Sequence, residues 1–271
     1  MKIALIQMPV TENKAQNLAY AAQEVARCAA MGARVIALPE MFMCPYQNDW
    51  FVRFAEPAGG ETHTAMARMA SENGIWLVGG SVPEADGGCI YNTSYVFGPD
   101  GAQVVRHRKM HLFDIDVAGG QYFKESDTFT PGSDVTTFEA EGVVFGLSIC
   151  FDIRFPELAR LAAMAGAQVL VTPGAFNMTT GPMHWELAFR QRAVDNQFFT
   201  VAISPARDEN GPYVAYGHSM VCSPWGKVME SLGHEAGSIV LDLDIEEVAR
   251  VRQQLPLMSA LRHDVYKLEL L

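Results

Sequence analysis

The 271-residue sequence contains no apolar stretch that approaches the roughly 20 residues of a membrane-spanning helix. The apolar run near its start, within residues 1–9, is too short for the core of a secretory signal peptide. Basic residues are scarce, with 20 Lys and Arg against 31 Asp and Glu and a formal net charge of −11. Nucleic acid and anionic lipid both attract clustered positive charge, so we expect no nucleic-acid partner and no membrane partner.

The sequence is also poor in cysteine and lacks several common catalytic and metal-binding motifs. Its five cysteines are odd in number and widely spaced, and no Cys-x-x-Cys pair occurs. This pattern favours a reduced, cytoplasmic protein without a zinc site. No Gly-x-Ser-x-Gly, Walker or His-Glu-x-x-His motif is present, which leaves serine hydrolases, P-loop enzymes and zinc peptidases without support. We therefore expect neither a metal ion nor another cofactor.

What the chain does contain is typical of one globular domain. Hydrophobic residues make up 49% and charged residues 19% of the sequence. No internal linker, repeat or low-complexity segment divides it, so we predict a single domain over residues 1–271. The tail from about residue 253 has no evident role in the core and is a candidate for packing on a partner subunit.

The order of apolar runs and helical patterns predicts the fold class. Apolar strands are expected at residues 3–7, 33–38 and 75–78, and helical patterns lie between them. Strands that alternate with helices form parallel sheets. A hairpin pattern at residues 90–105 and a meander at residues 217–243 add antiparallel strands. The prediction is an α/β fold, a four-layer α-β-β-α sandwich with two mixed β-sheets.

The stretch from residue 143 to residue 158 is the first candidate for chemistry. An apolar run ends at Cys150, and Pro156 and Glu157 then open a helical pattern, which predicts a strand, a sharp turn and a helix. A cysteine at such a turn lies near backbone N–H groups that favour a thiolate or an oxyanion. The alternative is a small buried residue that ends a core strand, because free cysteine is among the most buried residue types.

Two further residues would supply what a cysteine nucleophile lacks. Glu40 ends the apolar run 33–38, and the carboxyl ends of α/β strands commonly meet in one cleft. A shielded carboxylate can accept the thiol proton, and a lysine can stabilise the oxyanion that forms when a thiolate attacks a carbonyl or nitrile carbon. Lys109 lies in a polar patch, residues 106–114, whose alternative reading is a solvated surface. The loop expected from 114 to 132 is long, and loops of this length inside a compact domain usually have a function.

Three segments occur in a recognisable order: Leu-Pro-Glu-Met-Phe at 38–42, Arg-Lys-Met-His-Leu at 108–112, and Ser-Ile-Cys-Phe-Asp-Ile-Arg-Phe-Pro-Glu at 148–157. Together they resemble the signature blocks of the nitrilase superfamily of carbon–nitrogen hydrolases, and the similarity spans nearly the full chain. The resemblance implies a catalytic triad of Glu40, Lys109 and Cys150. It also implies that Glu125 is a second glutamate, which supports the lysine and orients the substrate.

A narrower resemblance begins at Pro173. Residues 173–187, 192–197 and 204–208 are similar to the ω-amidase branch, whose members hydrolyse the terminal amide of 2-oxoglutaramate and 2-oxosuccinamate. The resemblance implies a thiol-dependent amidase that releases ammonia through a cysteine thioester. Lys109 and the backbone N–H of Phe151 would then hold the oxyanion.

A small-molecule dicarboxylate monoamide would bring negative charge to an acidic protein, so its far carboxylate needs a local cation. Arg154 is the first candidate, and the alternative is that it forms a structural ion pair with Glu157 or Asp152. The other candidates for binding the substrate are Tyr46, Phe176, Asn177 and Thr179.

Alternative functions stay open on this sequence. One is another amidase of the same superfamily, which acts on deaminated glutathione or on N-carbamoyl amides, and another is a noncatalytic binding protein on the same fold. The presence of Glu40, Lys109 and Cys150 together weighs against the noncatalytic alternative. The resemblance also implies a homodimer or higher homo-oligomer, for which the segment after Asp152 and the C-terminal tail are candidate contact surfaces.

Overall fold

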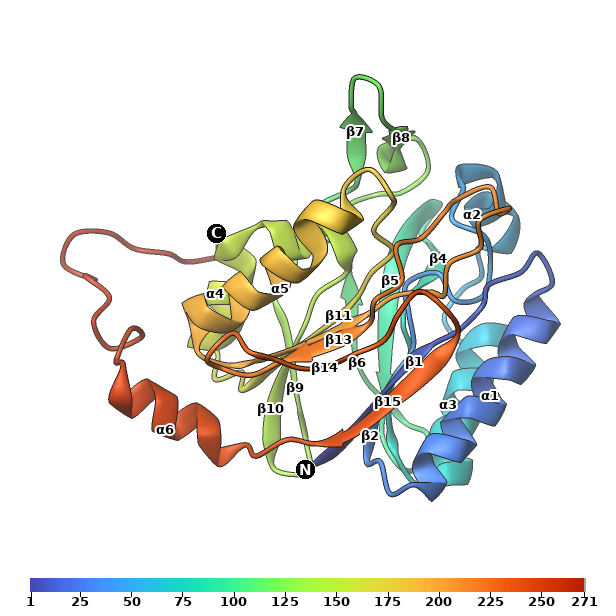
Figure 1. The fold of residues 1–271 in the computed structure, drawn as a ribbon. Helices are drawn as coiled ribbons and strands as arrows, with labels where there is room; N and C mark the ends of the chain where they lie inside the picture. The colour runs from blue at the N-terminus through green and yellow to red at the C-terminus, as the bar shows by residue number, and fades with distance from the viewer. Residues whose placement is uncertain (271) are drawn as a thin grey trace.

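The computed structural model describes residues 1–270 and shows two β-sheets packed face to face, with helices on the outer surfaces (Figure 1). The first sheet contains β1 (Lys2–Gln7), β2 (Val35–Ala37), β3 (Trp76–Val78), β4 (Val82–Asp86), β5 (Cys89–Phe97), β6 (Gln103–Arg108) and β15 (Gly237–Asp242). Their order is β15-β1-β2-β3-β5-β4, and β6 also pairs with β5. The sheet is mixed, because β1, β2 and β3 are parallel whereas β15 and β5 run against them.

The second sheet is also mixed. It contains β9 (Thr136–Ala140), β10 (Val143–Leu147), β11 (Val169–Pro173), β12 (Phe199–Ile203), β13 (Met220–Cys222) and β14 (Val228–Ser231). Their order is β14-β13-β12-β11-β10-β9, in which the central strands β10, β11 and β12 are parallel. The antiparallel strands β9, β13 and β14 extend the two edges.

Three apolar layers hold the sandwich together. Side chains such as Leu5, Val35 and Phe145 fill the space between the two sheets. A second layer lies between the first sheet and helices α1 (Lys14–Ala30) and α3 (Glu61–Asn73), and a third lies between the second sheet and helices α4 (Pro156–Met164) and α5 (Gly181–Asn196). Strands covered on both faces need apolar side chains on both, which explains their continuous apolar runs. The predicted four-layer α-β-β-α sandwich is therefore confirmed.

The helix ends follow local chemistry. Asn13 caps α1, and its side chain accepts a hydrogen bond from the N–H of Gln16 at 3.1 Å. α3 ends at Gly74, which adopts the left-handed conformation at φ 59° that glycine tolerates best. Pro156 occupies the first turn of α4, where its missing N–H leaves no helical hydrogen bond unmade.

Several elements were not predicted from the sequence. They are α2 (Asn48–Phe54), β4, β9 and a small hairpin of β7 (Asp114–Asp116) and β8 (Tyr122–Lys124). The hairpin lies inside the segment 114–132 that the sequence analysis described as one long loop, so that description was incomplete. Each of its strands has three residues. An alternation of polar and apolar side chains over so few residues is too short to predict a strand. The hairpin projects from the body of the molecule (Figure 1).

The last helix, α6 (Glu246–Gln254), lies below the second sheet in Figure 1, and the tail after it loops outward from the body. Along this tail Val265 and Tyr266 are exposed. The tail therefore contributes little to the core of the chain, as the sequence analysis expected.

The strands that carry the candidate residues end at one edge of the sandwich. Because β6 runs against β5 and β5 runs against β3, β6 has the same direction as β2. The turn after β2 is packed closely against the turn after β3, since a Cβ added to Gly80 would overlap the carbonyl oxygen of Pro39. Gly80 also has a φ of 57°, so glycine is required there for space and for conformation.

Candidate active site

Cys150 lies at a strained turn between β10 and α4. The helix predicted from Pro156 is α4, and the short 3-10 helix η2 (Cys150–Arg154), which was not predicted, precedes it. Cys150 has a φ of 47°, a conformation that residues other than glycine rarely adopt. Such strain persists only where the surrounding structure enforces it, and it is concentrated at functional sites.

Lys109, Glu40 and Glu125 form a buried charged cluster, and all three side chains are inaccessible to solvent. Lys109 Nζ lies 2.9 Å from Glu40 Oε1 and 2.8 Å from Glu125 Oε2. Lys109 follows β6, Glu40 follows β2, and Glu125 opens the 3-10 helix η1 (Glu125–Asp127). The structure therefore brings together three residues that the sequence analysis selected from distant segments.

Asn92 on β5 joins the two carboxylates, and the sequence analysis missed it. Its Nδ2 donates to Glu40 Oε1 and to Glu125 Oε1, both at 2.9 Å. The hydroxyl of Tyr46 lies 3.3 Å from the same two oxygens and 3.3 Å from Lys109 Nζ. One signal was available for Asn92, because asparagine is depleted inside β-strands. Tyr46 lies within the charged cluster and also lines a cavity beside Glu40, so its role as a substrate contact stays a prediction.

Burial and mutual attraction together set the charges of this cluster. Burial disfavours the ammonium of Lys109, but Glu125 and Glu40 outweigh that effect and raise the pKa of Lys109 above its ordinary value. Burial raises the pKa of Glu40, and the nearby Glu125 carboxylate adds to the increase while Lys109 opposes it. Lys109 is thus held positive, and the proton affinity of Glu40 is higher than that of an ordinary carboxylate.

The Cys150 thiol is buried beside this cluster. Burial raises the pKa of Cys150 well above its ordinary value, and the negative charge of Glu40 raises it further, while Lys109 and the N–H of Ala175 lower it. The Glu40 Oε2 atom is buried and has no hydrogen-bond partner within residues 1–270. A protonated thiol beside a carboxylate with a free oxygen and a raised pKa is the arrangement that general-base activation of a nucleophile requires.

We expect the pH profile of the enzyme to reflect Glu40. As a base, Glu40 must be ionised, so kcat/KM should fall as the pH falls through its raised pKa, with a midpoint above the ordinary value of 4.5. In Asn92→Leu the carboxylate loses a hydrogen bond that favours its charged form, so the midpoint should rise by about one pH unit. Steady-state assays between pH 4 and 8 check both shifts, and a wild-type midpoint at or below 4.5 would contradict the role of Glu40.

A small pocket beside Cys150 contains Arg154. Its lining residues are Phe113, Cys150, Phe151, Arg154, Ala175, Phe176 and Thr180. The Arg154 guanidinium lies over the Phe176 ring at 4.6 Å, and its Nη1 is 3.0 Å from His184 Nδ1. No carboxylate within residues 1–270 forms an ion pair with Arg154, and burial lowers the pKa of Arg154. The alternative that Arg154 pairs with Glu157 or Asp152 therefore finds no support.

The remaining predicted substrate contacts are placed differently from one another. Phe176 lies in the pocket with Cys150. Asn177 is buried, and its Oδ1 accepts from the N–H of Thr180 at 2.9 Å, while its Nδ2 has no partner within residues 1–270. Thr179 is exposed, and the threonine that lines the pocket is Thr180.

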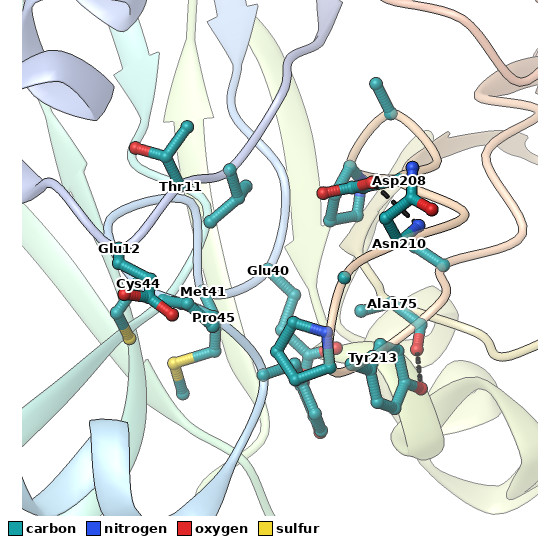
Figure 2. A pocket seen from close by; sticks show the side chains of 17 residues that line it. Thr11, Glu12, Glu40, Met41, Cys44, Pro45, Ala175, Asp208, Asn210 and Tyr213 are labelled. Atoms are coloured by element: carbon teal, nitrogen blue, oxygen red, sulfur yellow. Dashed lines mark hydrogen bonds between the residues drawn. The ribbon is translucent and has the colours of Figure 1, made fainter.

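A second and larger cavity is also lined by Glu40 (Figure 2). Its volume is about 290 Å³, and Glu12 and Asp208 are among its lining residues. Figure 2 shows Glu40 between the segment from Met41 to Pro45 and the loop that carries Asp208 and Asn210. The Tyr213 hydroxyl donates to the carbonyl of Ala175, a residue that lines both cavities.

Neither a metal-binding cluster nor a membrane-spanning helix is found in residues 1–270. Across residues 1–270, no group of three or more His, Cys, Asp or Glu side chains is arranged to hold a metal ion. In the same range, no helix has both the length and the apolar character that crossing a membrane demands.

Comparison with known proteins identifies relatives over almost the whole chain. Residues 2–253 match a family model described as carbon-nitrogen hydrolase. "Omega-amidase NIT2" of Danio rerio is 50% identical over 265 residues, which are 98% of this chain and 96% of that protein. The Xenopus tropicalis protein of the same name is 48% identical over 268 residues, 99% of this chain and 97% of that protein. Among solved structures, Saccharomyces cerevisiae Nit3, described as a member of branch 10 of the nitrilase superfamily, has a TM-score of 0.89 at 38% identity, covering 97% of this chain and 96% of that one.

Proposed function

The chain belongs to the carbon-nitrogen hydrolase family of the nitrilase superfamily, and from this membership we propose that it is an ω-amidase. Its substrates would be dicarboxylate monoamides such as 2-oxoglutaramate and 2-oxosuccinamate. The observation that carries this choice is Arg154, a half-buried guanidinium without a carboxylate partner within residues 1–270, which lines the same pocket as Cys150. Two relatives with the name omega-amidase, at 48% and 50% identity, support the same choice.

The first half of the proposed reaction forms a thioester. Glu40 takes the proton of the Cys150 thiol, and the thiolate attacks the amide carbon. Lys109 Nζ and the backbone N–H of Phe151 stabilise the oxyanion, since Phe151 lies in the first turn of η2, where N–H groups have no partner in the helix. Glu40 then gives its proton to the departing ammonia, so the C–N bond breaks and the thioester remains.

The second half hydrolyses the thioester. Glu40, again a carboxylate, takes a proton from water, and the hydroxide attacks the thioester carbon. The carboxylic acid leaves and Cys150 regains its proton, so the net change is amide and water to acid and ammonia. Glu125 would keep Lys109 in position throughout, because it accepts a hydrogen bond from Lys109 Nζ at 3.1 Å. Asn92 would do the same for Glu40, to which it donates at 2.9 Å.

Arg154 would hold the far carboxylate of the substrate. An arginine that is already partly desolvated and has no carboxylate partner within residues 1–270 gains more from a carboxylate than a fully exposed one would. Arg154→Gln should therefore raise the KM for 2-oxoglutaramate by about 100-fold, while the KM for an uncharged monoamide of similar length changes by less than about threefold. Ammonia release measured with both substrates tests this split.

The same assay tests the proposed function. Wild-type enzyme should release ammonia from 2-oxoglutaramate faster than from deaminated glutathione or an N-carbamoyl amide. Preference for one of those amides would assign the chain to another amidase of the superfamily. Absence of release from every amide would favour a noncatalytic binding protein. An equal KM for 2-oxoglutaramate in Arg154→Gln and wild type would remove Arg154 from the substrate site.

The proposed assembly is a homodimer. α5 exposes an apolar strip in which Met183 is 73% and Leu187 is 64% accessible, and Leu187 and Trp225 line one groove of about 230 Å³. Exposed apolar patches of this kind commonly mark protein interfaces. The tail after α6, with Val265 and Tyr266 exposed, would pack on the partner subunit.

We expect Leu187→Glu to break this dimer, because a charge would be buried in an apolar contact. Light scattering after size exclusion should then change from twice the chain mass of 29.7 kDa to a single chain. Val52→Glu on α2 is the matched control, since Val52 is 58% exposed but lies on another side of the molecule. A Leu187→Glu protein with the wild-type mass would exclude this face of α5 as the interface.

The proposed location is the cytoplasm. All five cysteines are free thiols. Cysteines that stay unpaired are typical of a reducing compartment, so this observation supports the proposal.

A further inference from the structure

Asp152 has a buried carboxylate that takes no part in the proposed reaction. Its Oδ2 accepts hydrogen bonds from the N–H of Ile149 at 3.0 Å and from His107 Nε2 at 3.1 Å. Its Oδ1 accepts from the N–H of His111 at 2.9 Å and from His111 Nδ1 at 2.8 Å. Since a carboxylate can only accept, both imidazole nitrogens that face Asp152 carry protons. One carboxylate therefore binds two histidines of the lysine segment and the backbone of its own turn at Ile149.

The two histidines flank Lys109. His107 lies two residues before it on β6, and His111 lies two residues after it. His107 is also held on its other side, because its Nδ1 is 3.0 Å from the hydroxyl of Thr136 on β9. The segment that carries Lys109 is therefore attached to Asp152 at both ends.

Asp152 also closes the turn that carries Cys150. Its carboxylate accepts from the N–H of Ile149, and its own N–H donates to the carbonyl of Ile149 at 3.0 Å. Cys150 lies inside this turn with its φ of 47°. A conformation of this kind needs support from its surroundings, and the paired hydrogen bonds of Asp152 supply it.

We propose that Asp152 is a positioning residue that sets the spacing between Lys109 and Cys150, with His107 and His111 as its links to the lysine segment. This inference rests on the proposed amidase function and deepens it. The oxyanion forms between Lys109 and the turn of Cys150, so the two must be held at one separation. A misplacement of about 1 Å can reduce catalysis by about 100-fold even when the altered residue does not touch the substrate.

Asp152→Asn is the first test. In the variant, one of the two carboxylate oxygens is replaced by an NH₂ group, which can only donate. That group faces either the N–H groups of His107 and Ile149 or those of His111, and the hydrogen bonds on that side are lost. We expect kcat per folded enzyme to fall by about 100-fold, with the KM for 2-oxoglutaramate changed by less than about threefold. A general loss of folded protein would lower the enzyme concentration and would leave kcat per folded enzyme unchanged.

A pair of His107 variants tests the link itself. His107→Leu removes the donor to Asp152 and should lower kcat about as much as Asp152→Asn, whereas His107→Gln keeps an N–H donor and should stay within about tenfold of wild type. Asp152→Asn combined with His107→Leu should be no worse than the more impaired single variant, because both changes break one link.

Thr200→Val is the matched control. Thr200 is buried on β12, and its hydroxyl donates to the carbonyl of Phe189 at 3.1 Å, so the change costs a buried hydrogen bond without touching the lysine segment. This variant should unfold at a lower temperature than wild type, and its kcat per folded enzyme should equal that of wild type.

A readout without substrate separates this inference from the proposed function. Iodoacetamide alkylation of Cys150, followed by peptide mass spectrometry, should be about tenfold slower in folded Asp152→Asn than in wild type. If the wild type releases no ammonia from any amide, the proposed function fails, and the alkylation rates still decide the positioning role. If Asp152→Asn has the same kcat and the same alkylation rate as wild type, the positioning role of Asp152 is overturned. If Asp152→Asn does not fold, the His107 pair decides, and equal impairment of His107→Gln and His107→Leu overturns it.

Discussion

Replacing Cys150 with alanine is expected to lower kcat for amide hydrolysis by about 10⁴-fold or more, because no other cysteine within residues 1–270 lines the pocket that contains Arg154. The buried thiol is uncharged, so its removal leaves the charges of the cluster unchanged and the protein should still fold. Binding of 2-oxoglutaramate should persist, because Arg154 and the pocket around it are unchanged. Ammonia release and calorimetric binding to the same preparation measure the two effects.

Cys222→Ala is the control for this result. Cys222 is also fully buried, but it packs in the apolar layer between the second sheet and its helices. Its replacement should cost stability and leave kcat per folded enzyme within about twofold of wild type. If Cys150→Ala kept more than about 1% of the wild-type kcat, the thioester pathway would be excluded.

Lys109→Met should damage both catalysis and folding. The variant loses an oxyanion donor, which should reduce kcat by about 10³-fold. It also leaves the buried carboxylates of Glu40 and Glu125 without their cation, which should reduce the free energy of unfolding by about 3–5 kcal/mol. Denaturant unfolding and ammonia release measure the two losses separately.

The lost stability should depend on pH in one direction. Without Lys109, burial and the neighbouring Glu125 carboxylate raise the pKa of Glu40 further above the unfolded value of about 4.3, so folding favours the protonated form of Glu40. A folded pKa above the unfolded one gives stability that is present at low pH and is lost as the pH rises through the folded pKa. The stability deficit of Lys109→Met should therefore be smaller at pH 5 than at pH 8.

A double variant separates charge from chemistry. Lys109→Met with Glu125→Gln removes one of the two negative charges, so it should recover at least about half of the lost free energy of unfolding. It should recover none of the activity, because the oxyanion donor is still missing. Equal stability of the double and the single variant would show that charge burial is not the cause of the loss.

The layers of this fold and the identities of the central residues followed from short-range patterns. Apolar runs such as residues 33–38 and 143–149 predict strands, and the polar residue that ends each strand is carried to the sheet edge with it. Glu40 and Cys150 became candidates for this reason, and Lys109 became one because a thiolate attack needs a cation. The resemblance to the nitrilase superfamily then implied the triad and added Glu125. The elements that were missed, such as β7 and β8, have three residues each and too little pattern to be recognised.

The sequence by itself determined which side chains are available, where the strands end and that the protein is acidic. Only the tertiary structure decided the partners of each buried polar group. Asn92 joins Glu40 and Glu125 across 52 and 33 residues of sequence, and Arg154 contacts His184 and forms no ion pair with a carboxylate of residues 1–270. A buried polar group forms a hydrogen bond with whichever partner the packing of distant segments brings within about 3 Å. The local sequence does not predict which segments come that close.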